Sequence, residues 1–200
     1  MQMSSEGFRS RRSIRLREYD YAIAGCYFVT ICARGRLPLF GDWINGSVNL
    51  NALGRVVDVC WNEIAAHFPR VTLDLYVIMP NHVHGIVVIR DDAEGPRGTP
   101  GDDPRDCGVP FAPVIHEGNT REAFRRPVTG SLPTIIRSFK SAVTKRRREA
   151  QLGGEDSVWQ RGYYEHVIRS PRSLEEIRRY IVENPARWPE DPENPVEVRI

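Results

Sequence analysis

The stretch VTLDLYVIMPNHVHGIVVIR (71–90) decides the fold. Two runs within it, VTLDLYVIM (71–79) and HVHGIVVI (82–89), are rich in β-branched residues and are separated only by Pro80-Asn81. They predict two strands joined by a tight connection. Side chains two positions apart on a strand point to the same face. His82 and His84 therefore project together, and Val83 turns to the opposite face, toward the core.

Segments on both sides of this pair predict the remaining elements. Apolar residues that recur every three or four positions are typical of amphipathic helices, and Asn-Gly is a strong signal for a tight hairpin turn. Ser170-Pro171 opens the last helix, or Ser173 with Glu176 caps it slightly later, and Pro185 ends it. The predicted elements are a strand at 25–34, a hairpin at 36–50 around Asn45-Gly46, helices at 50–68, 131–149 and 170–184, and a strand at 158–169.

The order strand, helix, strand, strand, helix, strand predicts an α+β fold. It closes most simply as a ferredoxin-like βαββαβ antiparallel sheet with helices on one face, followed by an additional C-terminal helix. Right-handed crossovers place the strands at 25–34 and 82–89 side by side at the centre. The open face of such a sheet is a common nucleic-acid platform. The expected organisation is a basic flexible arm (1–13), one domain (14–188) with a flexible insertion at about 91–130, and an acidic tail (189–200).

Composition narrows the class of protein. The chain has 200 residues, and 40% of them are hydrophobic, which is enough for one buried core. It contains no apolar run long enough for a membrane span and no apolar leader at its N-terminus. Its four cysteines form no CxxC pair, which argues against a zinc knuckle and a disulfide scaffold. We therefore expect a cytoplasmic protein without a membrane partner.

The net charge of +2 conceals separate basic and acidic segments. Three basic clusters, at 9–17, 137–148 and 169–187, indicate contact with a polyanion, of which nucleic acid is the most plausible. A solvated basic surface is the alternative. The candidate DNA-binding residues are Arg11, Arg12 and Arg15 in the arm, and Arg137, Lys140, Lys145, Arg146 and Arg147 in the second helix.

Two local patterns contain candidate metal ligands and a candidate nucleophile. The paired imidazoles of His82 and His84 can chelate one divalent metal, although two polar residues on a solvated sheet face would show the same spacing. Tyr180 and Asn184 lie four residues apart on one face of the last helix. A phenol near a metal can attack phosphorus, and an asparagine oxygen can be a third ligand. A boundary tyrosine and a helix-terminal asparagine are the alternative, and the Tyr163-Tyr164 pair competes for the role of nucleophile.

These motifs together resemble a known family. MPNHVHGIV (79–87), followed much later by IRRYIVENP (177–185) and preceded in the last strand by WQRGYYEHVIR (159–169), resembles the single-tyrosine HUH transposases of small insertion sequences. The closest resemblance is to their relatives associated with repetitive extragenic palindromes (REPs). It covers roughly residues 14–188, in the family's order.

The resemblance implies an enzyme and its reaction. His82 and His84 match the histidines that bind Mg²⁺ or Mn²⁺, and Asn184 matches the remaining protein ligand. Tyr180 matches the catalytic tyrosine, which attacks a DNA phosphate, becomes linked to the 5′ end and leaves a free 3′ hydroxyl. The implied substrate is single-stranded DNA with a hairpin, cleaved and rejoined in transposition or in processing of palindromic repeats by a monomer or a homodimer.

Two other classes of function share this fold. A non-catalytic or domesticated DNA-binding protein would need neither the histidine pair nor Tyr180. An RNA-binding module of the RRM type would carry aromatic residues at the centres of the 25–34 and 82–89 strands. Tyr27 fits that pattern, but the 82–89 strand carries histidines and no aromatic residue other than these.

Overall fold

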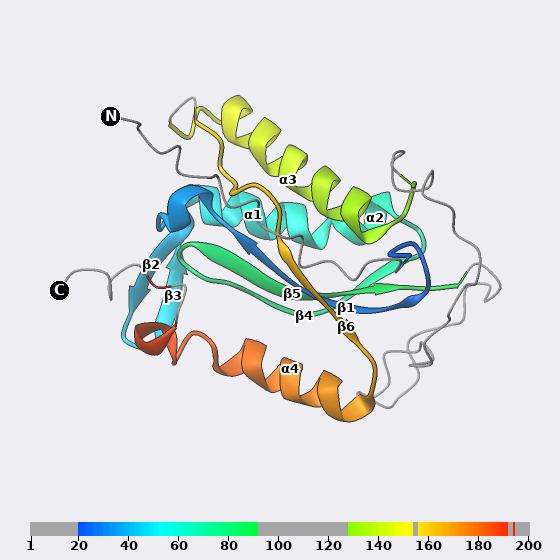
Figure 1. Cartoon of the computed structure of the whole chain (residues 1–200). Helices are drawn as coiled ribbons and strands as arrows, with labels where there is room; N and C mark the ends of the chain where they lie inside the picture. Colours follow the sequence, from blue (N-terminus) through cyan, green and yellow to red (C-terminus); the bar gives the residue numbers. More distant parts are fainter. Residues whose placement is uncertain (1–19, 92–127, 154–155, 192–193, 195–200) are drawn as a thin grey trace, which may run out of the picture.

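The sheet has the predicted ferredoxin-like topology. The computed structural model describes residues 20–91, 128–153, 156–191 and 194. Four antiparallel strands lie in the order β4-β5-β1-β6, with the first and third strands of the βαββαβ order paired at the centre (Figure 1). They are β1 (Gly25–Cys32), β4 (Val71–Ile78), β5 (His82–Ile89) and β6 (Tyr164–Ile168). The predicted α+β class and the side-by-side placement of the strands at 25–34 and 82–89 are confirmed.

Helices lie on both faces of this sheet. α1 (Ala52–Asn62), α2 (Ile64–His67) and α3 (Leu132–Glu149) cover one face, and α4 (Pro171–Glu183) covers the other (Figure 1). The single helix expected over 50–68 is divided at Glu63, whose amide is shared between the carbonyls of Val59 and Trp61 and so tightens the turn. Ser170 is the N-cap of α4, because its hydroxyl accepts from the Ser173 amide. The face expected to be open is therefore covered by the last helix.

The strand expected over 158–169 is shorter than predicted. Only Tyr164–Ile168 pair with β1, and Trp159 makes a single bridge to Ala33. The Lys140 Nζ occupies the carbonyls of Gln160 and Gly162, at 2.9 and 2.5 Å. Gly162 has a φ of +80°, outside the strand region. The Gln160 amide still donates to the Cys32 carbonyl of β1 at 3.0 Å, and these two features interrupt the pairing between that bond and Tyr164.

The predicted hairpin forms a separate small sheet beside one end of the main sheet (Figure 1). Its strands are β2 (Gly41–Ile44) and β3 (Ser47–Leu50). Asn45 and Gly46, with φ values of +50° and +83°, form the turn, as the Asn-Gly signal predicts. Asn51 follows directly and caps α1, because its Oδ1 accepts from the Gly54 amide at 2.9 Å.

Each face of the sheet buries its own apolar cluster. Val83 and Val87 of β5 pack with Trp61 of α1 and Phe139 of α3 in the larger cluster. Across the sheet, a smaller cluster joins the strands to α4: Cys26, Phe28, Ile86, Val88, Ile168, Leu174 and Ile181. Leu174 and Ile181 are fully buried and Ile177 packs beside them, as the predicted stripe requires. The smaller cluster thus fixes α4 over the strand that carries the histidines.

Several predicted segments lie outside the described residues. They include the arm (1–13), with Arg11 and Arg12, and also Arg15 and most of the insertion at about 91–130. The described part of the segment expected as an acidic tail packs on the domain, since Asp191 and Asn194 are buried. No helix among the described residues has both the length and the apolar character needed to cross a membrane.

Candidate metal and tyrosine site

The two histidines at the start of β5 face α4 and are buried together. His82 is 0% exposed and His84 is 3% exposed, and their ring centroids lie 4.3 Å apart. Val83 between them is buried in the larger cluster on the opposite face. The prediction that both side chains point to the same face of the sheet is confirmed. The alternative of two half-exposed residues on a solvated face is wrong.

The neighbouring Asn81 fixes the proton of His82. The Asn81 Nδ2 donates to the carbonyl of Arg36 at 2.9 Å, which leaves its Oδ1 to accept from the His82 Nδ1 at 2.8 Å. The proton of a neutral His82 therefore lies on Nδ1, and the lone pair lies on Nε2. This Nε2 is buried and has no hydrogen-bond partner among the described residues. A buried, unpartnered lone pair is well suited to a cation.

His84 is held from both sides of its ring. Thr30, its direct partner in the β1–β5 register, places Oγ1 2.8 Å from the His84 Nδ1. The hydroxyl of Tyr180 lies 3.1 Å from the His84 Nε2. Phe28 stacks on the same imidazole, with ring centroids 5.5 Å apart. The phenol on α4 and the imidazole on β5 are therefore in direct contact within one chain.

Burial keeps both imidazoles neutral. Desolvation, followed by the charge of Arg36, lowers the pKa of His82 to about 3. Desolvation also lowers the pKa of His84 well below its usual value, and a charge on His82 would lower it further, while Asp191 opposes the shift. Neutral rings keep the nitrogen lone pairs that a metal requires.

Tyr180 combines contact with the histidines and access to solvent. Its side chain is 37% exposed, although its hydroxyl contacts the buried His84. Of the two competing tyrosines, Tyr163 packs against the larger cluster on the opposite face. Tyr164 pairs with Thr30 at the edge of the sheet and is 42% exposed. Tyr180 is thus the tyrosine that the fold brings to the histidines.

Asn184 and Asp191 complete the polar group around the rings. Asn184, at the end of α4, is 2% exposed, and its Nδ2 donates to the Asp191 Oδ2 at 3.2 Å. The Asn184 Oδ1 is buried and has no hydrogen-bond partner among the described residues. His82, His84 and Asp191 each offer a ligand atom, and these atoms lie within 4.8 Å of one another. The two unpartnered atoms and the carboxylate fit a divalent cation such as Mg²⁺ or Mn²⁺.

Asp191, Asn81 and Thr30 are site residues that the sequence pattern does not predict. Asp191 lies in a segment expected to be an acidic tail, and no spacing connects it to the histidines. Trp188 is the one signal that the segment leading to Asp191 packs against the domain, because a large aromatic side chain gains stability when it is buried. It is 6% exposed, and its ring lies 5.9 Å from that of His82.

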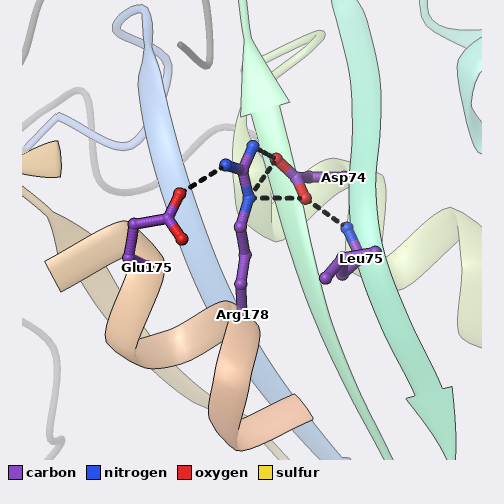
Figure 2. A network of polar contacts seen from close by, with 4 residues as sticks. All are labelled: Asp74, Leu75, Glu175 and Arg178. Carbon is purple, nitrogen blue, oxygen red and sulfur yellow. Dashed lines mark hydrogen bonds and ion pairs between the residues drawn. The ribbon is translucent and has the colours of Figure 1, made fainter. Parts of the chain in front are cut away.

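An ion-pair network ties α4 to the edge strand β4 (Figure 2). Arg178 donates to both carboxylate oxygens of Asp74, from Nε at 3.1 Å and from Nη2 at 2.5 Å, and also to Glu175 at 3.0 Å. Asp74 lies where the β4–β5 register shifts between Leu73 and Tyr76. This irregularity in β4 places the Asp74 carboxylate against α4, where it binds Arg178. Arg178 lies two residues before Tyr180. The network therefore fixes the helix that presents the phenol.

A second anchor lies at the end of the same helix. The indole Nε1 of Trp43, on β2, donates to the carbonyl of Pro185 at 2.7 Å. Pro185 directly follows Asn184, so the small β2–β3 sheet supports the chain at the site.

The basic residues of α3 lie on the other side of the sheet from the histidines (Figure 1). Arg137 and Lys145 are exposed. Lys140 is bound to backbone carbonyls, and burial lowers its pKa to about 8. Arg146 pairs with Glu63 at 2.7 Å, and Arg147 donates to the carbonyls of residues 152, 153 and 156. Lys145 also pairs with Glu149, but only at 3.8 Å. Four of the five basic residues predicted on α3 thus have partners inside the chain, three of them at short distance.

Known proteins resemble this chain in sequence and in fold. No protein-family model matches the chain. An uncharacterised protein of Haemophilus influenzae is 38% identical over 186 residues, which cover 92% of this chain and 93% of that protein. At this identity and coverage, the chain belongs to the same family as the Haemophilus protein.

Among solved structures, a REP-associated tyrosine transposase bound to a REP hairpin matches with a TM-score of 0.50. The match has 18% sequence identity and covers 88% of this chain and 74% of that one. The chain has the fold of the REP-associated tyrosine transposases. The resemblance predicted from its motifs is thus confirmed at the level of this transposase fold. A Deinococcus radiodurans structure described provisionally as a transposase matches more distantly, at a TM-score of 0.43 and 16% identity.

Proposed function

We propose that the chain is a metal-dependent transposase that cleaves and rejoins single-stranded DNA near hairpins through a 5′-phosphotyrosine intermediate. Such a reaction would serve DNA transposition or the processing of repeated palindromic elements. One observation carries the proposal: the Tyr180 hydroxyl lies 3.1 Å from the His84 Nε2 in a buried group of metal-ligand side chains. The solved REP-associated transposase, which is bound to a REP hairpin, supports hairpin DNA as the substrate class.

In this proposal, His82, His84 and Asn184 hold Mg²⁺ or Mn²⁺. The cation would act as a Lewis acid on the scissile phosphate. The Tyr180 oxygen attacks the phosphorus, the bond from phosphorus to the 3′ oxygen breaks, and the phenol proton ends on the departing 3′ hydroxyl. The 5′-phosphotyrosine keeps the energy of the phosphodiester, so the reverse attack by a 3′ hydroxyl rejoins DNA without ATP.

The burial pattern favours an enzyme over a non-catalytic DNA-binding protein on the same fold. Tyr180 is exposed enough to meet a substrate, whereas both histidines are buried. A protein that only binds DNA gains nothing from a buried, unpartnered His82 Nε2, because such an atom lowers stability. In a metal-dependent transposase, this nitrogen would be a ligand of the cation.

We also propose how the rest of the chain meets DNA. The exposed Arg137 and Lys145 on α3 hold backbone phosphates on the side of the sheet away from α4. Arg11, Arg12 and Arg15 of the arm hold further phosphates in this proposal. Lys140, Arg146 and Arg147 are structural in this scheme, because their hydrogen-bond donors are already engaged. Tyr180 contacts a histidine of its own chain, so a monomer suffices, and a homodimer is the alternative. We expect the protein to act in the cytoplasm.

An adduct assay tests the function. The protein is incubated with labelled single-stranded hairpin DNA and Mn²⁺, and the products are separated on a denaturing gel. The wild type should give a covalent protein–DNA adduct, which Tyr180→Phe abolishes while hairpin binding changes no more than a few fold. Tyr164→Phe is the matched control and should keep the adduct. An adduct of normal yield from Tyr180→Phe would overturn the assignment of the nucleophile.

A further inference from the structure

The segment that follows α4 returns to the histidines. After Pro185, the chain enters the short 3-10 helix η3 (Trp188–Glu190), and the Asp191 amide bonds to the Trp188 carbonyl at 3.1 Å. Asn194 closes the turn, donating from its amide to the Asp191 carbonyl at 2.8 Å and from Nδ2 to the Trp188 carbonyl at 2.9 Å. Trp188, Asp191 and Asn194 are all buried. The turn therefore holds Asp191 in a fixed place beside the site.

From this place, Asp191 acts on two groups of the site. Its Oδ2 accepts from the Asn184 Nδ2, and this contact leaves the Asn184 Oδ1 as the atom without a partner. A carboxylate oxygen of Asp191 also lies within 4.8 Å of a ring nitrogen of both His82 and His84. Ring nitrogens of both histidines and a buried carboxylate therefore lie close together, and Asn184 is bound to that same carboxylate. The His82 Nε2 and the Asn184 Oδ1 lack hydrogen-bond partners among the described residues.

We propose that Asp191 is a ligand of the divalent cation, together with His82 and His84, and that it also orients Asn184 toward the same ion. The inference rests on the proposed metal-dependent function and extends it, because Asp191 lies outside the motifs that carry the resemblance. It adds an anionic oxygen to a set that otherwise consists of two neutral imidazoles and an amide.

The added carboxylate determines which metal the site prefers. Imidazole nitrogen suits Zn²⁺, Cu²⁺ and Ni²⁺, whereas carboxylate and carbonyl oxygens suit Mg²⁺ and Mn²⁺. With Asp191 the set contains two nitrogens and two oxygens, one of them charged. Without Asp191 the set is neutral and relatively richer in nitrogen. Asp191 should therefore favour the harder cations over Ni²⁺.

Metal binding by the full-length chain without DNA tests this role. Calorimetric titrations with Mn²⁺ and Ni²⁺ are compared for the wild type, Asp191→Asn and Glu190→Gln. Glu190→Gln is the matched control, because it removes the same charge one residue away from an exposed side chain. Asp191→Asn should weaken Mn²⁺ binding at least about tenfold, which is the lower limit for losing a metal-site partner, and should weaken Ni²⁺ binding less. Glu190→Gln should bind both metals as the wild type does.

The comparison of the two metals separates a ligand from a structural residue. A damaged fold would weaken both metals alike, and equal losses for Mn²⁺ and Ni²⁺ would overturn the inference. Unchanged Mn²⁺ affinity in Asp191→Asn would also overturn it and leave Asp191 as a hydrogen-bond acceptor for Asn184. If Asp191→Asn does not fold, Asp191→Glu keeps the charge with a longer reach and should shift the ratio of Mn²⁺ to Ni²⁺ affinity; an unchanged ratio would count against a ligand.

The test also distinguishes this inference from the proposed function. A wild type that forms the DNA adduct while Asp191→Asn keeps full Mn²⁺ affinity would refute the ligand and leave the function standing. A wild type that binds Mn²⁺ through Asp191 and forms no adduct would refute the proposed function and leave Asp191 as a metal ligand.

Discussion

The two faces of β5 differ in what they are built to do. Toward α1 and α3, the strand presents Val83, Gly85 and Val87 to a large apolar cluster. Toward α4, it presents His82 and His84, followed by Ile86 and Val88. Alternate residues of one strand thus serve stability on one side and chemistry on the other. Substitutions at neighbouring positions should therefore separate folding from activity.

Single substitutions of the adjacent residues His84 and Val83, which face opposite sides of the sheet, should have the largest effects. His84→Ala removes the contact with Tyr180 and a metal-ligand nitrogen, so the adduct yield should fall at least about a hundredfold. Val83→Ala leaves the site intact but removes two buried methyl groups. It should lower the free energy of unfolding by about 2 kcal/mol, with little change in adduct yield. Adduct gels and urea unfolding measure the two effects. A His84→Ala chain that still forms the adduct in normal yield would show that the α4 face of β5 is not needed for the chemistry.

Gly85→Ala should give the next largest effect, on folding alone. A Cβ at this position would lie 2.3 Å from the Cζ2 of Trp61. We expect the free energy of unfolding to fall by about 1–3 kcal/mol, as in other overpacked cores. Trp61→Phe shortens the opposing ring, so the double variant should lose less stability than the sum of the single losses. Strict additivity in urea unfolding would show that the indole does not limit this position.

The fold and part of the site could be predicted because their signals are local. The alternation in β5, the Asn45-Gly46 turn and the apolar stripe of α4 each follow from neighbours in the sequence, and so do the paired histidines. The role of Thr30 depends on the register between β1 and β5, which no local pattern fixes. Asp191 depends on a turn formed after α4. The length of β6 depends on Lys140, a residue on another element that occupies the carbonyls before the strand.

Arg178 allows the position of Tyr180 to be tested apart from the histidines on β5. Its ion pair with Asp74 holds the helix against β4, and both side chains are about 15% exposed (Figure 2). Arg178→Met should therefore loosen Tyr180 and slow adduct formation about tenfold, because a small misplacement of a reacting group is costly. Metal binding should change less, since both histidines lie on β5, and Asn184 and Asp191 follow α4 in a segment held by the Trp43–Pro185 and Asn194–Trp188 hydrogen bonds. Arg179→Met, at an exposed position next to it, is the control for the lost charge. Equal rates for the two variants would show that the apolar stripe alone positions the tyrosine.

The smallest effect is expected on α3, far from the histidines, where exposed and engaged basic residues can be compared directly. Lys145 is exposed, and its nearest acid, Glu149, lies 3.8 Å away, whereas Arg146 is bound to Glu63 at 2.7 Å. If α3 holds duplex phosphates, Lys145→Ala should lower the slope of log affinity against log salt by about one. Arg146→Ala should leave the slope unchanged, because its guanidinium already has an acidic partner. Salt titrations of hairpin binding measure both slopes. Equal slopes for the wild type and Lys145→Ala would show that the DNA phosphates do not bind this helix. The surface around the exposed Tyr180 and Tyr164 would then be the next one to test.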